Sequence, residues 1–162
     1  MSAAKPLPVE TPKPVVVYAD DDAGNRQAFR AAFRHAMEVH TAATAAEVMD
    51  LLARHAVHVV IADQRMPMTR GSALLAEIRD KYPAVRRMLV TAYADLEDII
   101  EALNNGGVTK YFAKPWVNEQ LVMAVDQAFA DIRAEADRVA YTKRLEDANR
   151  QLEFALRQRL LS

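Results

Sequence analysis

The chain has 162 residues, of which 51% are hydrophobic, and its formal net charge at pH 7 is −1. This length and composition fit one well-filled domain with an appendage, and the near-neutral charge gives no general attraction to nucleic acid or to an anionic membrane. The sequence has no cysteine, which excludes disulfides, thiolate catalysis and thiolate metal sites. No apolar run approaches the ~20 residues of a membrane-spanning helix, so we expect a soluble cytoplasmic protein that binds neither a membrane nor nucleic acid directly.

The first 14 residues contain four prolines, at positions 6, 8, 12 and 14. A proline-rich segment favours an extended, mobile chain, and this one lacks the apolar stretch of a signal peptide. We therefore predict a flexible leader over residues 1–14, before the folded part of the protein.

Short apolar runs alternate with helical patterns from Val15 onward. Apolar and β-branched residues predict strands over residues 15–19, 38–42, 57–62, 86–91 and 108–113. Apolar residues at helical spacing predict helices over residues 23–37, 44–55, 72–81 and 96–104. In the second of these helices, Thr44 is expected to be the N-cap and Glu47 its capping-box partner. The repeated alternation predicts an α/β fold, a doubly wound parallel sheet with helices on both faces.

Polar residues stand at the carboxyl ends of four predicted strands. Asp20 and Asp21 follow the first strand, Asp63 follows the third, Thr91 ends the fourth, and Lys114 follows the fifth. Because the carboxyl ends of parallel strands line one crevice, we expect these side chains to meet at one edge of the sheet. Carboxylates, a hydroxyl and an ammonium group together suit one divalent cation and one phosphoryl group.

The three acids would repel one another unless a cation neutralised them. Mg²⁺ prefers oxygen ligands and few carboxylates, so it is the cofactor that this set predicts. Asp63 is the candidate nucleophile toward a phosphoryl donor, with Lys114 to neutralise charge and Thr91 to bond a phosphoryl oxygen. The simpler alternatives are a helix N-cap cluster for the acids, a surface lysine, and an ordinary strand threonine. Lys114 precedes Pro115, and this pair is a candidate cis peptide bond.

The last segment, from Val117 to the end, contains no glycine or proline. Its apolar residues recur at steps of three and four, with a slip of register by one residue between Val139 and Leu145; they are Val125, Phe129, Ile132, Ala136, Val139, Leu145, Ala148, Leu152 and Leu156. This pattern predicts one extended helix over residues 117–162, whose first part packs on the sheet. From about residue 131 it has nothing in the chain to pack against, so we predict a coiled coil with a second copy. Fraying or a fold-back hairpin beyond residue 140 is the alternative.

Four stretches together resemble the receiver domain of two-component response regulators. They are VVVYADDDAGNRQAF, VHVVIADQRMP, RRMLVTAYADLEDIIEALNNGG and VTKYFAKPW, and the resemblance covers about residues 15–130. It implies a flavodoxin-like five-stranded parallel sheet with strand order 2-1-3-4-5.

The resemblance also implies roles for particular residues. Asp63 is the implied phosphoacceptor, and Lys114 is the implied partner of the phosphoryl group. The implied Mg²⁺ ligands are Asp21, Asp63, the backbone carbonyl of Arg65 and, through water, Asp20. Thr91 and Tyr111 match the switch pair, in which the hydroxyl turns toward the phosphoryl group while the aromatic ring turns inward. We further expect the Arg65 side chain to shield or contact the phosphoryl group and to change its lifetime. Tyr93 is expected to cover the site, with an ordinary surface aromatic on a loop as the alternative.

The sequence therefore predicts a phosphorylation switch, and not an enzyme with a substrate of its own. A histidine kinase is expected to phosphorylate Asp63. The stretches DQRMP, TAYADLED and KPW resemble receivers that precede long helical linkers and output modules. No output motif is present and the chain ends within the helix, so we expect it to belong to a longer protein; a natural stand-alone receiver with a dimerising tail is the alternative. Two alternatives are a dimerising scaffold that works without phosphorylation and an aspartate-nucleophile phosphatase of the haloacid-dehalogenase type.

Overall fold

The computed structural model describes residues 12–92, 96–105 and 107–161, in which strands and helices alternate. The elements in chain order are β1 (Val15–Ala19), α1 (Ala23–Phe33), β2 (Glu38–Ala42), α2 (Ala45–Arg54), β3 (Val59–Asp63), α3 (Gly71–Lys81), β4 (Arg86–Thr91), α4 (Leu96–Asn104), β5 (Lys110–Ala113) and α5 (Asn118–Leu161). Each predicted strand and helix is present. The expectations for residues 1–11 of the leader, for Tyr93 and for Ser162 at the end of the last helix lie outside the described residues.

The five strands form one parallel sheet in the order β2-β1-β3-β4-β5, as predicted. The central strand β3 is buried along its whole length, which agrees with its continuous apolar sequence. Because all strands run in the same direction, the ends of β1, β3, β4 and β5 lie along one edge. The chain adds β2 on one side of β1 and β3 on the other, and this change of direction in the strand order places a crevice at that edge.

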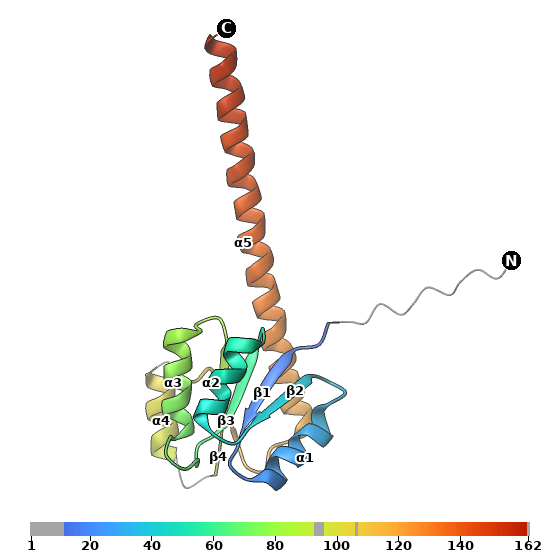
Figure 1. Cartoon of the computed structure of the whole chain (residues 1–162), viewed down its shortest axis with the longest axis vertical. Coiled ribbons are helices and arrows are strands. Elements are labelled where there is room, and N and C mark those ends of the chain that lie inside the picture. Colours follow the sequence, from blue (N-terminus) through green and yellow to red (C-terminus); the bar gives the residue numbers. More distant parts are fainter. Residues whose placement is uncertain (1–11, 93–95, 106, 162) are drawn as a thin grey trace, which may run out of the picture.

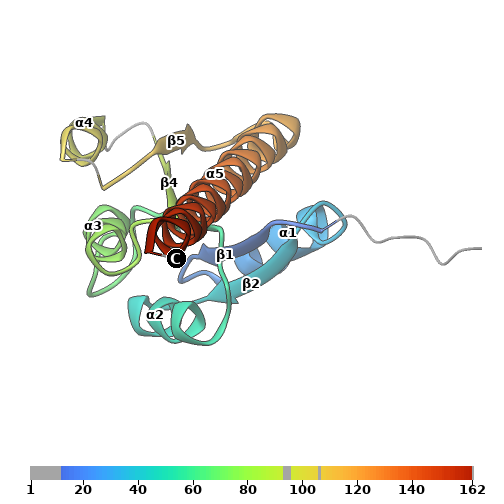
Figure 2. The ribbon, with the colours of Figure 1, turned by 90° about the horizontal axis from the view of Figure 1, so that it is seen from above.

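Helices cover both faces of the sheet, so the protein has two apolar cores (Figures 1 and 2). One core lies between the sheet and α2, α3 and α4, with Val48, Leu52, Leu74, Leu75, Ile78 and Ile99 among its members. The other lies between the sheet and α1 and α5, with Tyr18, Phe29, Phe33, Met37, Leu121 and Val125 among its members.

Three element boundaries differ from the sequence prediction by two residues or more. The helix predicted over residues 23–37 ends at Phe33, because the chain turns there and buries Met37 in the second core. The third strand begins at Val59 and includes Asp63, and the fifth begins at Lys110. Pro14 is buried, and its carbonyl accepts a hydrogen bond from the backbone of Glu38.

The predicted cap of α2 is present with one change of partner. The Thr44 hydroxyl accepts a hydrogen bond from the backbone N–H of Glu47, as in a capping box. The Glu47 carboxylate, in turn, accepts from the N–H of Ala43 and not from that of Thr44. At α1, the side chain of Asp22 caps the helix by accepting from the N–H of Asn25. The N-cap alternative for the acidic cluster therefore applies to Asp22.

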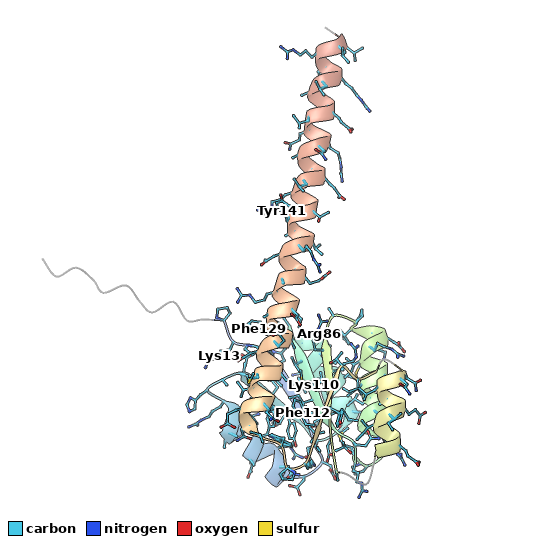
Figure 3. All side chains as sticks on the ribbon, turned by 180° about the vertical axis from the view of Figure 1, so that it is seen from behind. Lys13, Arg86, Lys110, Phe112, Phe129 and Tyr141 are labelled. Carbon is cyan, nitrogen blue, oxygen red and sulfur yellow. The ribbon has the colours of Figure 1, made fainter. Side chains whose placement is uncertain are left out.

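Helix α5 has two parts with different surroundings. Leu121, Ala124, Val125 and Ala128 are buried against the sheet. From Arg133 to Leu161 every residue is exposed, and the helix continues without a break through the slip of register at residues 139–145. Figure 3 shows Phe129 beside the sheet and Tyr141 on the projecting part. At 1.5 Å per residue, the projecting part is about 40 Å long. Among the described residues, no helix is long and apolar enough to cross a membrane.

A histidine joins the sheet to α5 at the amino ends of the strands. The Nδ1 atom of His58 accepts a hydrogen bond of 2.9 Å from the N–H of Val15, and the N–H of His58 donates to the carbonyl of Val15. The imidazole also lies edge-on to the ring of Phe129, which carries the guanidinium of Arg133 on its face. This contact ends the part of α5 that is held by the domain.

Candidate functional site

Three aspartates meet at the carboxyl edge of the sheet. Asp20 and Asp21 directly follow β1, and Asp63 ends the neighbouring strand β3. One carboxylate oxygen from each lies within 4.8 Å of the others, with Asp20 and Asp63 buried and Asp21 exposed. Three carboxylate oxygens at this spacing, one side open to solvent, fit a small hard divalent cation that keeps several water ligands.

Asp20 is held from several directions by groups of the protein. Its Oδ2 atom accepts from the Tyr18 hydroxyl at 2.8 Å and from the Asn25 amide at 3.1 Å, and its Oδ1 atom accepts from the N–H of Asp22 at 2.9 Å. The guanidinium of Arg26 donates to the Asp20 backbone carbonyl. Sequence reasoning missed Tyr18 and Asn25. The signal for Tyr18 was its place two residues before Asp20, since residues i and i+2 of a strand share a face.

Lys114 brings the positive charge that the sequence predicted. Its Nζ atom lies 3.2 Å from a carboxylate oxygen of Asp63 and 3.8 Å from one of Asp20. The backbone N–H of Lys114 donates to the carbonyl of Thr91, which fixes the end of β5 to the end of β4. The Lys114–Pro115 peptide bond is cis. The ammonium group is therefore part of the same cluster as the acids.

The electrostatics of Asp63 reflect two opposing effects. Burial raises the pKa of the Asp63 carboxyl above its ordinary value, and the neighbouring Asp20 charge acts in the same direction. The ammonium of Lys114 and a backbone hydrogen bond from Arg65 oppose this by lowering the pKa, but the net direction is upward. Burial and the hydrogen bond to Asp20 likewise raise the pKa of the Tyr18 hydroxyl, so it stays protonated as a donor. The cluster thus has an excess of negative charge that an added cation would relieve.

The loop between β3 and α3 is closed at its base by Gln64, a buried residue that sequence reasoning missed. The Gln64 side chain accepts from the N–H of Ser72 at 2.8 Å and donates to the Ser72 hydroxyl. The backbone carbonyl of Gln64 accepts from the N–H of Gly71. Arg65 follows with an exposed side chain, and exposed Met68 has a positive φ of 71°. The chain beside Asp63 is therefore held in a defined shape.

Thr91 and Tyr111 occupy neighbouring strands but different environments. Thr91 is 1% exposed at the end of β4, and its hydroxyl donates to the backbone carbonyl of Ala92 at 3.1 Å. Tyr111 is on β5 with 44% of its surface exposed, and it lines an open hollow beside α5. The structure thus brings Asp20, Asp21, Asp63 and Lys114 together, places Thr91 on the adjacent strand end, and leaves the Tyr111 ring outside.

An aromatic cavity of about 510 Å³ opens beside Lys114, between α1 and the turn after β5. The rings of Tyr18, Phe29 and Trp116 form part of its wall. Tyr18 and Phe29 stack nearly parallel with their centroids 4.1 Å apart, and Trp116 lies edge-on to Phe29. The packing of α1 therefore reaches the acid cluster through the Tyr18 hydroxyl.

The chain is similar to proteins of known family. Residues 16–126 match the response regulator receiver domain. The hydrogenase transcriptional regulatory protein HoxA of Cupriavidus necator is 37% identical over 113 residues, which make up 70% of this chain and 23% of HoxA. The transcriptional regulator NtrC of Escherichia coli is 31% identical over 117 residues, 72% of this chain and 25% of NtrC. The match thus spans about a quarter of the length of these regulators.

Solved structures agree with this similarity. The signal receiver domain of an HD domain-containing protein from Pseudomonas fluorescens superposes with a TM-score of 0.71 at 30% identity, covering 76% of this chain and 99% of that domain. A response regulator receiver domain protein from Clostridium thermocellum gives a TM-score of 0.70 at 25% identity, covering 75% of this chain and 98% of that one. Both comparisons leave about a quarter of this chain uncovered.

Proposed function

The chain belongs to the response regulator receiver domain family, and on this premise we propose that it is a phosphorylation switch whose acceptor is Asp63. The observation that carries the proposal is the arrangement of the Lys114 ammonium, 3.2 Å from Asp63, beside the carboxylates of Asp20 and Asp21. Asp63 is a buried carboxylate with the Lys114 ammonium beside it and a candidate metal site at Asp20 and Asp21, and such an arrangement suits the binding of a phosphoryl group. A histidine kinase is the partner that this family implies.

In the proposed reaction, an Asp63 carboxylate oxygen attacks the phosphorus of a phosphohistidine. The new O–P bond forms as the N–P bond breaks, and the imidazole of the donor leaves with the electron pair. In this proposal Lys114, now 3.2 Å from Asp63, moves to pair with the phosphoryl oxygens. The Thr91 hydroxyl, at the end of the adjacent strand β4, donates to one of them. The catalytic contribution of these residues is positioning and neutralisation of charge.

The donor set fits Mg²⁺, which when bound would neutralise charge on the acids and on the transferred group. Asp21, Asp63 and the Arg65 backbone carbonyl would hold it directly, and Asp20 through water. Tyr18 and Asn25 orient the Asp20 carboxylate. The hydrogen bonds between Gln64 and Ser72 hold the loop that carries Arg65.

We propose that Thr91 and Tyr111 report the phosphorylated state. The Thr91 hydroxyl, now bonded to the carbonyl of Ala92, would turn to the phosphoryl group. The space that it leaves would admit the Tyr111 ring, which now lies outside beside α5. A change on this face would reach α5 directly, because both Tyr111 and residues of α5 line the same hollow.

The proposed output passes through the projecting part of α5 to a module in a longer protein. The apolar residues on this part are exposed and include Val139, Tyr141, Leu145, Leu152, Phe154 and Leu156. A second copy of the helix would cover them in a coiled coil from about residue 131. Support for a linked output module comes from the relatives, which are named as transcriptional regulators and are about four times as long as the matched part.

The test is the mass of the intact protein after incubation with Mg²⁺ and either acetyl phosphate or a phosphorylated histidine kinase. One added phosphoryl group is expected on the wild type and none on Asp63→Asn. Asp80→Asn, which removes an exposed carboxylate on α3, is the matched control and should be phosphorylated like the wild type. No adduct on a folded wild type would favour the dimerising scaffold, whereas turnover of a phosphomonoester would favour the phosphatase.

A further inference from the structure

Tyr18 places a hydroxyl group inside an apolar core. The residue is 1% exposed, and its ring packs flat on Phe29 among the buried residues between the sheet and α1. Because Tyr18 and Asp20 are two residues apart on β1 and its continuation, both side chains lie on the same side of the sheet. The hydroxyl donates to Oδ2 of Asp20 at 2.8 Å, which satisfies a donor that burial shields from water.

The hydrogen bonds of Asp20 leave it little capacity for further contacts. Each carboxylate oxygen offers two lone-pair sites. On Oδ2, both are taken, by the Tyr18 hydroxyl and by the Asn25 amide, and the Lys114 ammonium lies 3.8 Å from the same oxygen. On Oδ1, one is taken by the N–H of Asp22, so a single site is left.

The two donors to Oδ2 differ in how easily they are replaced. Asn25 is an exposed residue on α1, and water can take the place of its amide. Tyr18 is 1% exposed beneath the stacked ring of Phe29, so water does not readily replace Oδ2 as the acceptor for its hydroxyl. In the proposed function Lys114 moves to the phosphoryl group, so the Tyr18 hydrogen bond is the contact that keeps Oδ2 closed to a cation.

We propose that Tyr18 is a positioning residue that makes Asp20 a one-oxygen acceptor and thereby favours Mg²⁺ over Ca²⁺ at the acid cluster. Ca²⁺ readily takes both oxygens of a carboxylate in a flexible shell of six to eight ligands, whereas Mg²⁺ requires near-octahedral geometry with single oxygens and retained waters. With Oδ2 occupied, Asp20 suits the second kind of ion only. This inference rests on the proposed function, in which the cluster binds a divalent cation.

The test is the ratio of Mg²⁺ to Ca²⁺ affinity in the full chain and in its Tyr18→Phe variant. Titration with each metal salt can be followed by the fluorescence of Trp116, the single tryptophan, and by calorimetry. The variant keeps the ring and its packing but frees one site on Oδ2. We expect the preference for Mg²⁺ to fall at least about threefold, mainly because Ca²⁺ binds more tightly.

Tyr82→Phe is the matched control, since it removes a hydroxyl from a partly buried tyrosine on the other side of the sheet. It should leave the ratio unchanged, and thermal melts of both variants establish that they are folded. An unchanged ratio in folded Tyr18→Phe that still binds Mg²⁺ would overturn the role of Tyr18 and leave the proposed function intact. Absence of binding by the wild type would overturn both together.

Discussion

A methyl group on Gly71 would lie 2.3 Å from the backbone carbonyl oxygen of Asp63, well inside van der Waals contact. The first residue of α3 thus packs directly against the end of β3, and the N–H of Gly71 closes the intervening loop by donating to the carbonyl of Gln64. The loop beside the proposed phosphoacceptor therefore requires glycine at position 71, because a larger residue would not fit against the end of β3.

Replacing Gly71 with alanine should destabilise the protein and disturb the site. The obstacle is backbone, which cannot move aside as a flexible side chain can, so we expect a loss of about 1–3 kcal/mol in the free energy of unfolding, with slower phosphorylation of Asp63. Urea unfolding and intact mass measure the two effects. Gly24→Ala is the control, because its nearest contact is the exposed Asp22 side chain at 3.1 Å. Equal stability of the two variants would contradict the prediction.

The raised pKa of Asp63 predicts how metal-free stability depends on pH. The folded protein binds the Asp63 proton more tightly than the unfolded chain does. The free energy of unfolding therefore falls as pH rises above 3.8, the ordinary pKa of an aspartate carboxyl. Asp63→Asn should therefore raise Tm in EDTA at pH 7 by roughly 2–4 °C, the shift expected for a change of ~1 kcal/mol in a protein of this size.

This gain should shrink as pH falls below about 4, where the carboxyl is protonated in both states. Excess Mg²⁺ should reverse the order of the two proteins, because a ligand that binds only the folded wild type stabilises it by mass action. Melting curves with EDTA and with Mg²⁺ test both statements. A less stable Asn variant in EDTA at pH 7 would contradict the first.

His58 predicts a loss of stability on the acid side of neutrality. Burial lowers the pKa of its imidazole from 6.5, although the Glu38 carboxylate opposes this, so the unfolded chain takes up the proton first as pH falls. Protonation would also remove the lone pair that accepts from Val15. His58→Gln should lose less Tm than wild type between pH 7 and 5, by about 1–3 °C for a partly exposed ring. His35→Gln, at an exposed site, should match wild type.

Arg65 should control the lifetime of the phosphoryl group. Its side chain is exposed two residues after Asp63, where it can shield an acyl phosphate from water. An exposed charged contact contributes ~0.5–1 kcal/mol, so Arg65→Ala should shorten the half-life of the phosphorylated protein about two- to fivefold. Loss of phosphate from purified phosphoprotein measures this, with Arg70→Ala as the control. An unchanged half-life would remove the proposed role of Arg65.

The exposed leucines of α5 should hold two copies together. In a coiled coil, positions 145 and 152 would be buried, so glutamates there would bury two negative charges. The variant with Leu145 and Leu152 both changed to glutamate should therefore be a monomer at concentrations where wild type is a dimer. Sedimentation and light scattering give the mass. Arg150→Glu changes charge on the same helix away from these leucines and should remain a dimer. A monomeric wild type would contradict the predicted pairing.

The fold and the main cluster could be predicted from the sequence because they depend on strand ends. A parallel sheet brings the residues after β1, β3 and β5 to one edge whatever the details of packing, so Asp20, Asp21, Asp63 and Lys114 had to converge. The long helix was equally predictable, since the segment after Val117 has no residue that would end it.

Only the tertiary structure decided which side chains of different elements come into contact. The Tyr18 hydroxyl reaches Asp20 because Phe29 of α1 holds its ring flat, and Gln64 clamps Ser72 because the loop returns to its own start. Burial also decided that α1 ends at Phe33, so that Met37 can enter the core, and that the domain holds α5 only as far as Phe129. Local pattern specifies which residues are apolar, but packing in three dimensions selects which of them are covered.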